Sequence, residues 1–207
     1  NHNRWYVTVK NGTFLYSVDG GQSFETSTYT GTKPRANDQS YNYHKNQHVI
    51  KGSEIDVDKV YYAGVGNLFL ISEDGGKTFT NHSTGLNVYR IRDFDLSPDE
   101  KFIFAACGSA GIRVFSVDDN RWYSMNDEPV PNVDFTDVEY MIKENAVKFA
   151  SYGSGILRLN LDVPADAITY PDNLTGEAIS ASEIKLAWDD KSANEDGFII
   201  ERAIKGI

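Results

Sequence analysis

An internal repeat constrains the fold of this chain more than any other feature of its sequence. Four segments resemble one another, and they lie at residues 6–17, 61–72, 105–116 and 149–160. Each has an apolar stretch, a tight turn with glycine, and a second stretch in which apolar and polar residues alternate, which is the pattern of a β-hairpin. The second, third and fourth segments follow one another at intervals of 44 residues. A period of this length with several strands in each repeat is typical of the blades of a β-propeller.

Each of the four segments is expected to form two paired, antiparallel strands. The strands are predicted near residues 5–10 and 14–18, 60–65 and 68–72, 102–107 and 112–117, and 147–152 and 156–161. The 12 tyrosines, 11 phenylalanines and 17 glycines of the chain also favour β structure over helix. The predicted fold class is therefore all-β.

A second pattern, S-x-D-x-G-x-[S/T]-F, follows two of these hairpins. Its first copy consists of Ser17, Asp19, Gly21 and Phe24, and its second copy of Ser72, Asp74, Gly76 and Phe79. An aspartate can accept backbone N–H groups within a tight turn, a glycine can adopt positive φ, and a phenylalanine can anchor the next strand in apolar packing. We therefore interpret both aspartates as structural turn residues rather than as a catalytic acid/base pair.

These turns resemble Asp-box repeats, also called BNR repeats, which occur in sialidase-like propellers, in xyloglucan-cleaving glycoside hydrolases and in several non-catalytic propellers. A third copy keeps Ser116, Asp118 and an aromatic residue, Trp122, but lacks the glycines. The resemblance implies that residues 1–162 are the C-terminal part of an Asp-box propeller, with about three to four blades visible.

The repeat pattern ends near residue 162, and a different module follows it. Residues 163–172 contain two prolines and small residues suited to an extended linker. Residues 173–207 alternate into Trp188 and then read WDDKSANEDGFIIER, which resembles the start of bacterial fibronectin type III modules. The resemblance implies an immunoglobulin-like β-sandwich with Trp188 in its core. We expect this sandwich to be truncated, because a complete one needs on the order of 100 residues.

The first repeat interval is 55 residues, and its surplus falls in a polar, tyrosine-rich stretch at 26–48. Because neighbouring strands alternate in direction, this connection should emerge at the end of the sheets opposite the Asp-box-like turns. In the propellers that the chain resembles, that face holds the ligand cleft. We therefore predict weak ligand contacts from Tyr29, Arg35, Tyr41 and Tyr43, which could stack on a sugar and hydrogen-bond to it. The alternative is a long surface loop without a ligand.

Residues suited to metal, cofactor or nucleophilic chemistry are scarce. The single cysteine, Cys107, lies in an apolar run and is interpreted as a buried, inert thiol. His44 and His48 have a helical metal-ligand spacing, but their polar surroundings lack helical periodicity, so we interpret them as solvated loop residues. We predict no metal, no cofactor and no catalytic residue within this chain.

The charge of the chain limits its partners. Its formal net charge is −10 and its pI is about 4.8, which argues against a phosphate-binding surface and hence against nucleic acid. No apolar run approaches the roughly 18 residues needed to span a bilayer. The expected partner is a polysaccharide or other glycan, or another protein.

Together these features favour part of a secreted or cell-surface bacterial multidomain protein that acts on or binds glycans. The leading hypothesis is a xyloglucanase-like glycoside hydrolase whose catalytic carboxylates lie outside this segment. The alternative is a non-catalytic adhesin or assembly scaffold that uses its propeller and fibronectin-type modules for protein or glycan contact.

Overall fold

The computed structural model of the chain describes residues 3–9, 13–31, 48–125, 130–161, 171–180, 182–189, 198 and 200. The chain divides into two compact units, Asn1–Leu161 and Asp162–Ile207. Among the described residues no helix is long and apolar enough to cross a membrane. The described part of the chain is all-β apart from one 3-10 turn, η1 (Ile142–Glu144).

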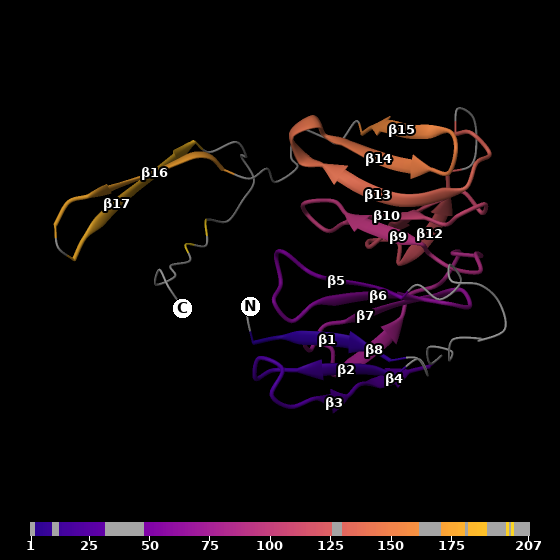
Figure 1. Cartoon of the computed structure of the whole chain (residues 1–207), viewed down its shortest axis with the longest axis horizontal. Coiled ribbons are helices and arrows are strands. Elements are labelled where there is room, and N and C mark those ends of the chain that lie inside the picture. The colour runs from indigo at the N-terminus through magenta and orange to yellow at the C-terminus, as the bar shows by residue number, and fades with distance from the viewer. Residues whose placement is uncertain are drawn as a thin grey trace. The chain divides into compact units, whose positions relative to one another are not determined.

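In the described part of the larger unit, the strands form four sheets in chain order (Figure 1). The first sheet contains β1 (Trp5–Thr8), β2 (Phe14–Ser17) and β3 (Glu25–Thr26). The second contains β5 (Val49–Gly52), β6 (Val60–Gly64), β7 (Leu68–Ser72) and β8 (Thr78–Asn81), with β4 (Thr28–Thr30) at its edge. The third contains β9 (Asp93–Leu96), β10 (Phe102–Ala106), β11 (Ile112–Ser116) and β12 (Arg121–Ser124). The fourth contains β13 (Phe135–Met141), β14 (Ala146–Ser151) and β15 (Gly155–Asn160).

The four predicted hairpins are confirmed. Antiparallel pairing joins β1 to β2, β6 to β7, β10 to β11 and β14 to β15. In the second, third and fourth hairpins the turn between the two strands contains glycine at positive φ, at Gly66, Gly108 and Gly153. The repeated sequence therefore corresponds to a repeated structural unit.

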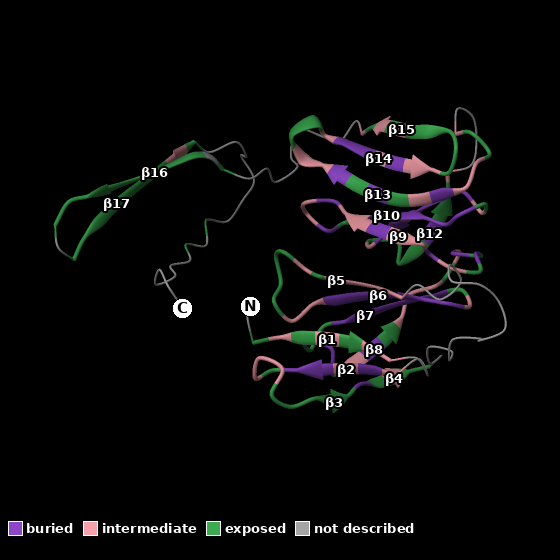
Figure 2. Ribbon diagram, viewed as in Figure 1, coloured by how far each residue is buried: buried purple, intermediate pink, exposed green. Residues whose placement is uncertain are grey.

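The apolar core lies between consecutive sheets, because successive side chains of a strand point to opposite faces. On β6, Tyr61 and Ala63 face the third sheet, whereas Val60 and Tyr62 face the first sheet. A further cluster, which includes Phe104 and the fourth-sheet residue Phe149, packs the third sheet against the fourth. The middle sheets are thus buried on both faces, as β6 and β7 show along their whole length (Figure 2).

The outer sheets of the described stack are covered on one face. β1 alternates between exposed and half-buried residues, and β15 is mostly exposed. Repeats with similar sequences therefore differ in how far their strands are buried, according to whether their sheet is an outer or a middle one.

One strand departs from the sequence-based expectation. The start of the polar 26–48 stretch was interpreted as a connecting loop, but Thr28–Thr30 forms β4, which pairs in parallel with β8. Thr28 lies opposite Thr78, and the Ser27 hydroxyl donates to the carbonyl of Gly76. The outer edge of β8 offers unpaired backbone groups, and a segment of threonine and tyrosine suits a strand.

The smaller unit contains one described hairpin, formed by β16 (Asp172–Ala178) and β17 (Ile184–Asp189). Trp188 on β17 contacts the Phe198 ring edge-to-face at a centroid distance of 5.0 Å. Trp188 is half-buried, and Phe198 and Ile200 are exposed. The expected core position of Trp188 is therefore only partly enclosed, because the described strands of this unit supply a single layer.

Candidate functional site

The first turn, residues 17–24, is held together by its own side chains. Asp19 Oδ1 accepts the backbone N–H groups of Gln22 and Ser23, each at 3.0 Å. The Ser17 hydroxyl donates to Asp19 Oδ1 at 2.7 Å and accepts the Gly21 N–H at 2.9 Å. Hydrogen bonds from the Ser23 hydroxyl and N–H, with one from the Ser17 hydroxyl, hold the pKa of Asp19 well below its usual range.

The second turn, residues 72–79, repeats this arrangement. The Ser72 hydroxyl donates to Asp74 Oδ1 at 2.8 Å and accepts the Gly76 N–H at 2.9 Å. Asp74 Oδ1 also accepts the Thr78 N–H at 2.8 Å. Burial alone would raise the pKa of Asp74, but hydrogen bonds from Thr78 and Ser72 outweigh it and lower the pKa. Both carboxylates are thus engaged within their own turns.

The two phenylalanines of these turns lie in different surroundings. Phe79 is fully buried, with its ring centroid 4.6 Å from that of Phe14. Phe24 is 41% exposed. The apolar anchoring predicted for both residues is therefore found at Phe79 but is wrong for Phe24, because in the described structure Phe24 belongs to an outer sheet.

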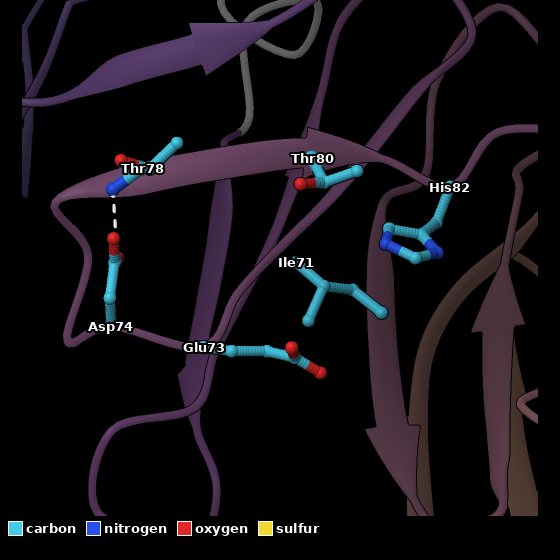
Figure 3. A pocket seen from close by; sticks show the side chains of 6 residues that line it. All are labelled: Ile71, Glu73, Asp74, Thr78, Thr80 and His82. Atoms are coloured by element: carbon cyan, nitrogen blue, oxygen red, sulfur yellow. Dashed lines mark hydrogen bonds between the residues drawn. The ribbon is translucent and has the colours of Figure 1, made fainter.

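A cavity of about 400 Å³ opens beside the second turn. Figure 3 shows its lining residues, which are Ile71, Glu73, Asp74, Thr78, Thr80 and His82. His82 is also tied to the third sheet, because its Nδ1 lies 2.7 Å from Asn120 Oδ1. Since Asp74 is engaged by Thr78, the groups left to meet a small polar ligand are Glu73, Thr80 and His82.

Of the four predicted ligand residues, Tyr29 is described, whereas Arg35, Tyr41 and Tyr43 lie outside the described residues. The Tyr29 ring stacks on Phe79 at a centroid distance of 6.1 Å, and its hydroxyl accepts the Phe14 N–H at 3.2 Å. Burial raises the pKa of Tyr29. Tyr29 therefore packs between the first and second sheets, and a ligand contact from it stays a prediction.

The residues considered for metal or thiol chemistry occupy packed positions. Cys107 is buried as predicted, and burial raises the pKa of its thiol to about 12. His44 lies outside the described residues. His48 was expected in a solvated loop, but its Nδ1 lies 2.6 Å from the Tyr62 hydroxyl and its ring stacks on Tyr62. The described residues contain no group of three or more His, Cys, Asp or Glu side chains arranged for a metal ion.

Arg90, Arg92 and Asp134 form a cluster of charged residues that no sequence motif indicated. Arg92 Nη2 lies 2.7 Å from Asp134 Oδ2, and this ion pair joins the segment before β9 to the segment before β13. Burial lowers the pKa of Arg90, the charge of Arg92 lowers it further, and the charge of Asp134 opposes both effects. In the described structure Arg92 pairs with Asp134, and Arg90, two residues earlier in the chain, forms no ion pair.

Backbone hydrogen bonds place this cluster at one end of the sheets. The Gly66 N–H, in the turn between β6 and β7, donates to the Tyr89 carbonyl at 2.8 Å. The Tyr152 N–H, in the turn after β14, donates to the Asp134 carbonyl at 2.8 Å. β7 runs from this end to the second turn, so its five residues separate the two by roughly 17 Å. The cluster therefore lies at the end of the sheets where a ligand was expected.

Gly108 makes room for the ion pair. A Cβ at this position would lie 2.8 Å from Arg92 Nε and 3.2 Å from Asp134 Oδ1, and the φ of Gly108 is +65°. A larger residue would both strain the backbone and displace the pair. Sequence signals for the cluster existed in the tripeptide Arg90–Ile91–Arg92 and in the glycine turn at 107–111, but nothing in the sequence links them to Asp134.

Comparison with known proteins gives the fold context of these features. No protein-family model matches the chain, and no curated protein matches it. Among solved structures, a glycoside hydrolase family 74 enzyme from Niastella koreensis has a TM-score of 0.53 at 19% identity, over 76% of this chain and 22% of that chain. An ancestral enzyme of the same family has a TM-score of 0.52 at 14% identity, over 84% of this chain and 24% of that one.

A structure of YCF48 bound to D1 peptide also matches, with a TM-score of 0.53 at 14% identity, over 92% of this chain and 59% of that chain. The chain thus spans between 22% and 59% of the length of these three structures. At these identities the likeness concerns the fold alone. Together with the repeated antiparallel sheets, it identifies the fold as a β-propeller like that of the family 74 enzymes.

Proposed function

We propose that this chain is the glycan-contacting part of a secreted or cell-surface bacterial protein. In the most specific form of this proposal, the whole protein is a xyloglucanase-like glycoside hydrolase whose catalytic carboxylates lie outside this segment. The propeller fold shared with the family 74 enzymes supports this proposal. So does the serine–aspartate hydrogen bonding of the first and second turns, which we assign as Asp-box turns.

The observation that carries the proposal is a pair of exposed tyrosines beside the charged cluster. Tyr89 is 61% exposed and Tyr152 is 82% exposed. Tyr89 adjoins Arg90, and the Tyr152 N–H donates to the carbonyl of Asp134. Aromatic rings next to fixed polar groups suit a sugar, which has both apolar C–H faces and hydroxyl groups.

The smaller unit is proposed to be the start of a fibronectin type III module. Two features support this assignment. Apolar residues alternate along β17 and end in Trp188, and β17 pairs with β16 in antiparallel fashion. Modules of this kind space and present other domains, so we propose no ligand for it.

Isothermal titration calorimetry with xyloglucan oligosaccharides tests the glycan proposal. Tyr89→Ala and Tyr152→Ala should each weaken binding by roughly 2- to 10-fold, since an aromatic contact contributes about 0.5–1.5 kcal/mol. Tyr123→Ala is the matched control, because Tyr123 is a comparably exposed tyrosine on β12. If the two test variants bind every glycan tried as well as the unaltered chain does, the proposed surface is wrong.

A non-catalytic role in protein contact is the second candidate function. The match to YCF48, whose structure contains a bound peptide, extends over 92% of this chain and favours it. Loss of a protein partner in both tyrosine variants, with no glycan binding by the unaltered chain, would select this candidate.

A further inference from the structure

The charged cluster stands out against the chemistry of the rest of the chain. Arg90 and Arg92 lie two residues apart in the chain, and Arg92 forms an ion pair with Asp134. Arg90 is a second guanidinium near this pair, and it has no ion pair of its own in the described structure. On a protein whose net charge is −10, such a guanidinium gives an anion one place to bind.

Within the cluster, Arg92 and Asp134 form an ion pair through one atom of each side chain. Their ion pair is 2.7 Å long, and the remaining unpartnered atoms, Arg92 Nε and Asp134 Oδ1, both lie close to the site of a Gly108 Cβ. A small rotation of the guanidinium would pair these two atoms and make the contact bidentate, which is the preferred geometry for arginine and carboxylate. Asp134 is thus engaged by Arg92.

Arg90 is the group left over. In the described structure its side chain makes no ion pair or hydrogen bond, and its Nη1 atom is buried without an acceptor. A buried donor without an acceptor is costly, and a charged donor more so. Arg90 as a whole is half-buried, and its Nη2 and Nε atoms are not among the buried ones. A ligand carboxylate can therefore meet the guanidinium on its open side and balance its charge.

The surroundings of Arg90 favour a sugar as the carrier of that carboxylate. The exposed Tyr89 directly precedes Arg90 in the chain, and the exposed Tyr152 donates its backbone N–H to the Asp134 carbonyl. A uronic acid residue presents a carboxylate at one edge of its ring and C–H groups on its faces. It can therefore meet an arginine and an aromatic ring at the same time.

We infer that Arg90, held beside the Arg92–Asp134 pair, binds the carboxylate of a uronic acid residue in an acidic glycan. The inference rests on the proposed glycan function and names the class of glycan. Arg92 and Asp134 are positioning residues in this site, because they fix the segment that carries Arg90. Gly108 leaves the space in which they meet.

The test compares an oligogalacturonate with its fully methyl-esterified form, in which each carboxylate is replaced by an uncharged methyl ester. Calorimetry with the full chain should show binding of the acid about tenfold or more tighter than binding of the ester, the effect of one charge-assisted hydrogen bond. Arg90→Gln should abolish this preference while leaving binding of the ester unchanged. Arg90→Lys should keep part of the preference, because it keeps the charge but loses the planar fork.

Arg121→Gln is the control, because Arg121 is an exposed arginine at the other end of the third sheet, where it lies opposite Ser116. It should leave the preference for the acid intact. Circular dichroism of each variant should match the unaltered chain, since Arg90 has no partner to lose among the described residues. The preference should also weaken as salt concentration rises.

The outcomes separate the inference from the proposed function. Equal binding of acid and ester, unaffected by Arg90→Gln, overturns the uronate site while the glycan function stands. A preference for the acid that survives Arg90→Gln also overturns it. If neither glycan binds, but a peptide with a free terminal carboxylate binds in an Arg90-dependent way and its amide does not, both the glycan function and the uronate assignment are wrong.

Discussion

The first and second turns share one sequence pattern but lie in different surroundings. In both, the serine hydroxyl bridges the aspartate and a glycine N–H, and that glycine, Gly21 or Gly76, has a φ of +86°. In both, the preceding glycine donates its N–H to a carbonyl from a neighbouring loop. The local structure of the two turns is therefore nearly the same.

Their packing is different. The second turn is covered by the first sheet, whose Tyr6 and Tyr16 side chains lie against Gly76. The first turn meets the Trp5 ring of its own sheet, and its phenylalanine is largely open. The sequence pattern S-x-D-x-G-x-[S/T]-F therefore determines the hydrogen bonding inside the turn. The neighbouring sheet determines how much the turn contributes to the stability of the fold.

The largest difference between the two turns in the loss of stability on substitution is expected for their phenylalanines. Phe79→Ala should lower the free energy of unfolding by about 3–5 kcal/mol, because it empties a fully buried aromatic site. Phe24→Ala should cost less than about 1 kcal/mol, because Phe24 is 41% exposed. Urea unfolding followed by fluorescence measures both values. Equal costs would show that the first turn is as covered as the second.

A smaller difference is expected for the two glycines at φ +86°. Gly21→Ala should cost about 1–2 kcal/mol, the penalty for a side chain in a left-handed conformation. Gly76→Ala should cost about 1 kcal/mol more, since its Cβ would lie 2.9 Å from Tyr6 Cε1, compared with 3.3 Å from the Trp5 ring at Gly21. Thermal unfolding of the two variants shows which one loses more stability. A larger loss for Gly21→Ala than for Gly76→Ala would contradict the prediction.

The smallest difference is expected for the two aspartates, because their contacts are local. The pKa of each is lowered in the folded chain. Each should therefore contribute stability that is present above the unfolded pKa of about 4 and is lost as pH falls below it. Asp19→Asn and Asp74→Asn should each flatten the decline of Tm below about pH 4, and Asp19→Asn somewhat more, because burial opposes the lowering of the pKa at Asp74.

The third, glycine-free copy of the turn supplies the control for this pH experiment. Among the described residues the side chain of Asp118 makes no hydrogen bond within its turn, where the Asp119 N–H donates instead to the Ser116 hydroxyl at 3.3 Å. Asp118→Asn should leave the pH dependence of Tm unchanged. A flattening equal to that of Asp74→Asn would mean that the decline comes from overall charge rather than from the turns.

The parts of the structure that the sequence predicted are those in which the interacting residues are neighbours in the chain. The hairpins follow from alternation and glycine turns, and the positions of β6 and β7 could be read almost to the residue. The position of β4 could not be read from the sequence, because β4 pairs with a distant strand, β8. In this pairing Thr28 lies opposite Thr78, 50 residues later in the chain. Phe24 and Phe79 could not be told apart, because they occupy the same place in the same pattern.

The all-β class, the repeated hairpins and the serine–aspartate turns follow from the sequence, since these depend on backbone preferences and on hydrogen bonds spanning four residues or fewer. Which turn is buried, and that Arg92 meets Asp134, 42 residues later in the chain, depend on the tertiary structure. Contacts of this length depend on how one sheet packs on the next, and the chain between the partners carries no local signal of it.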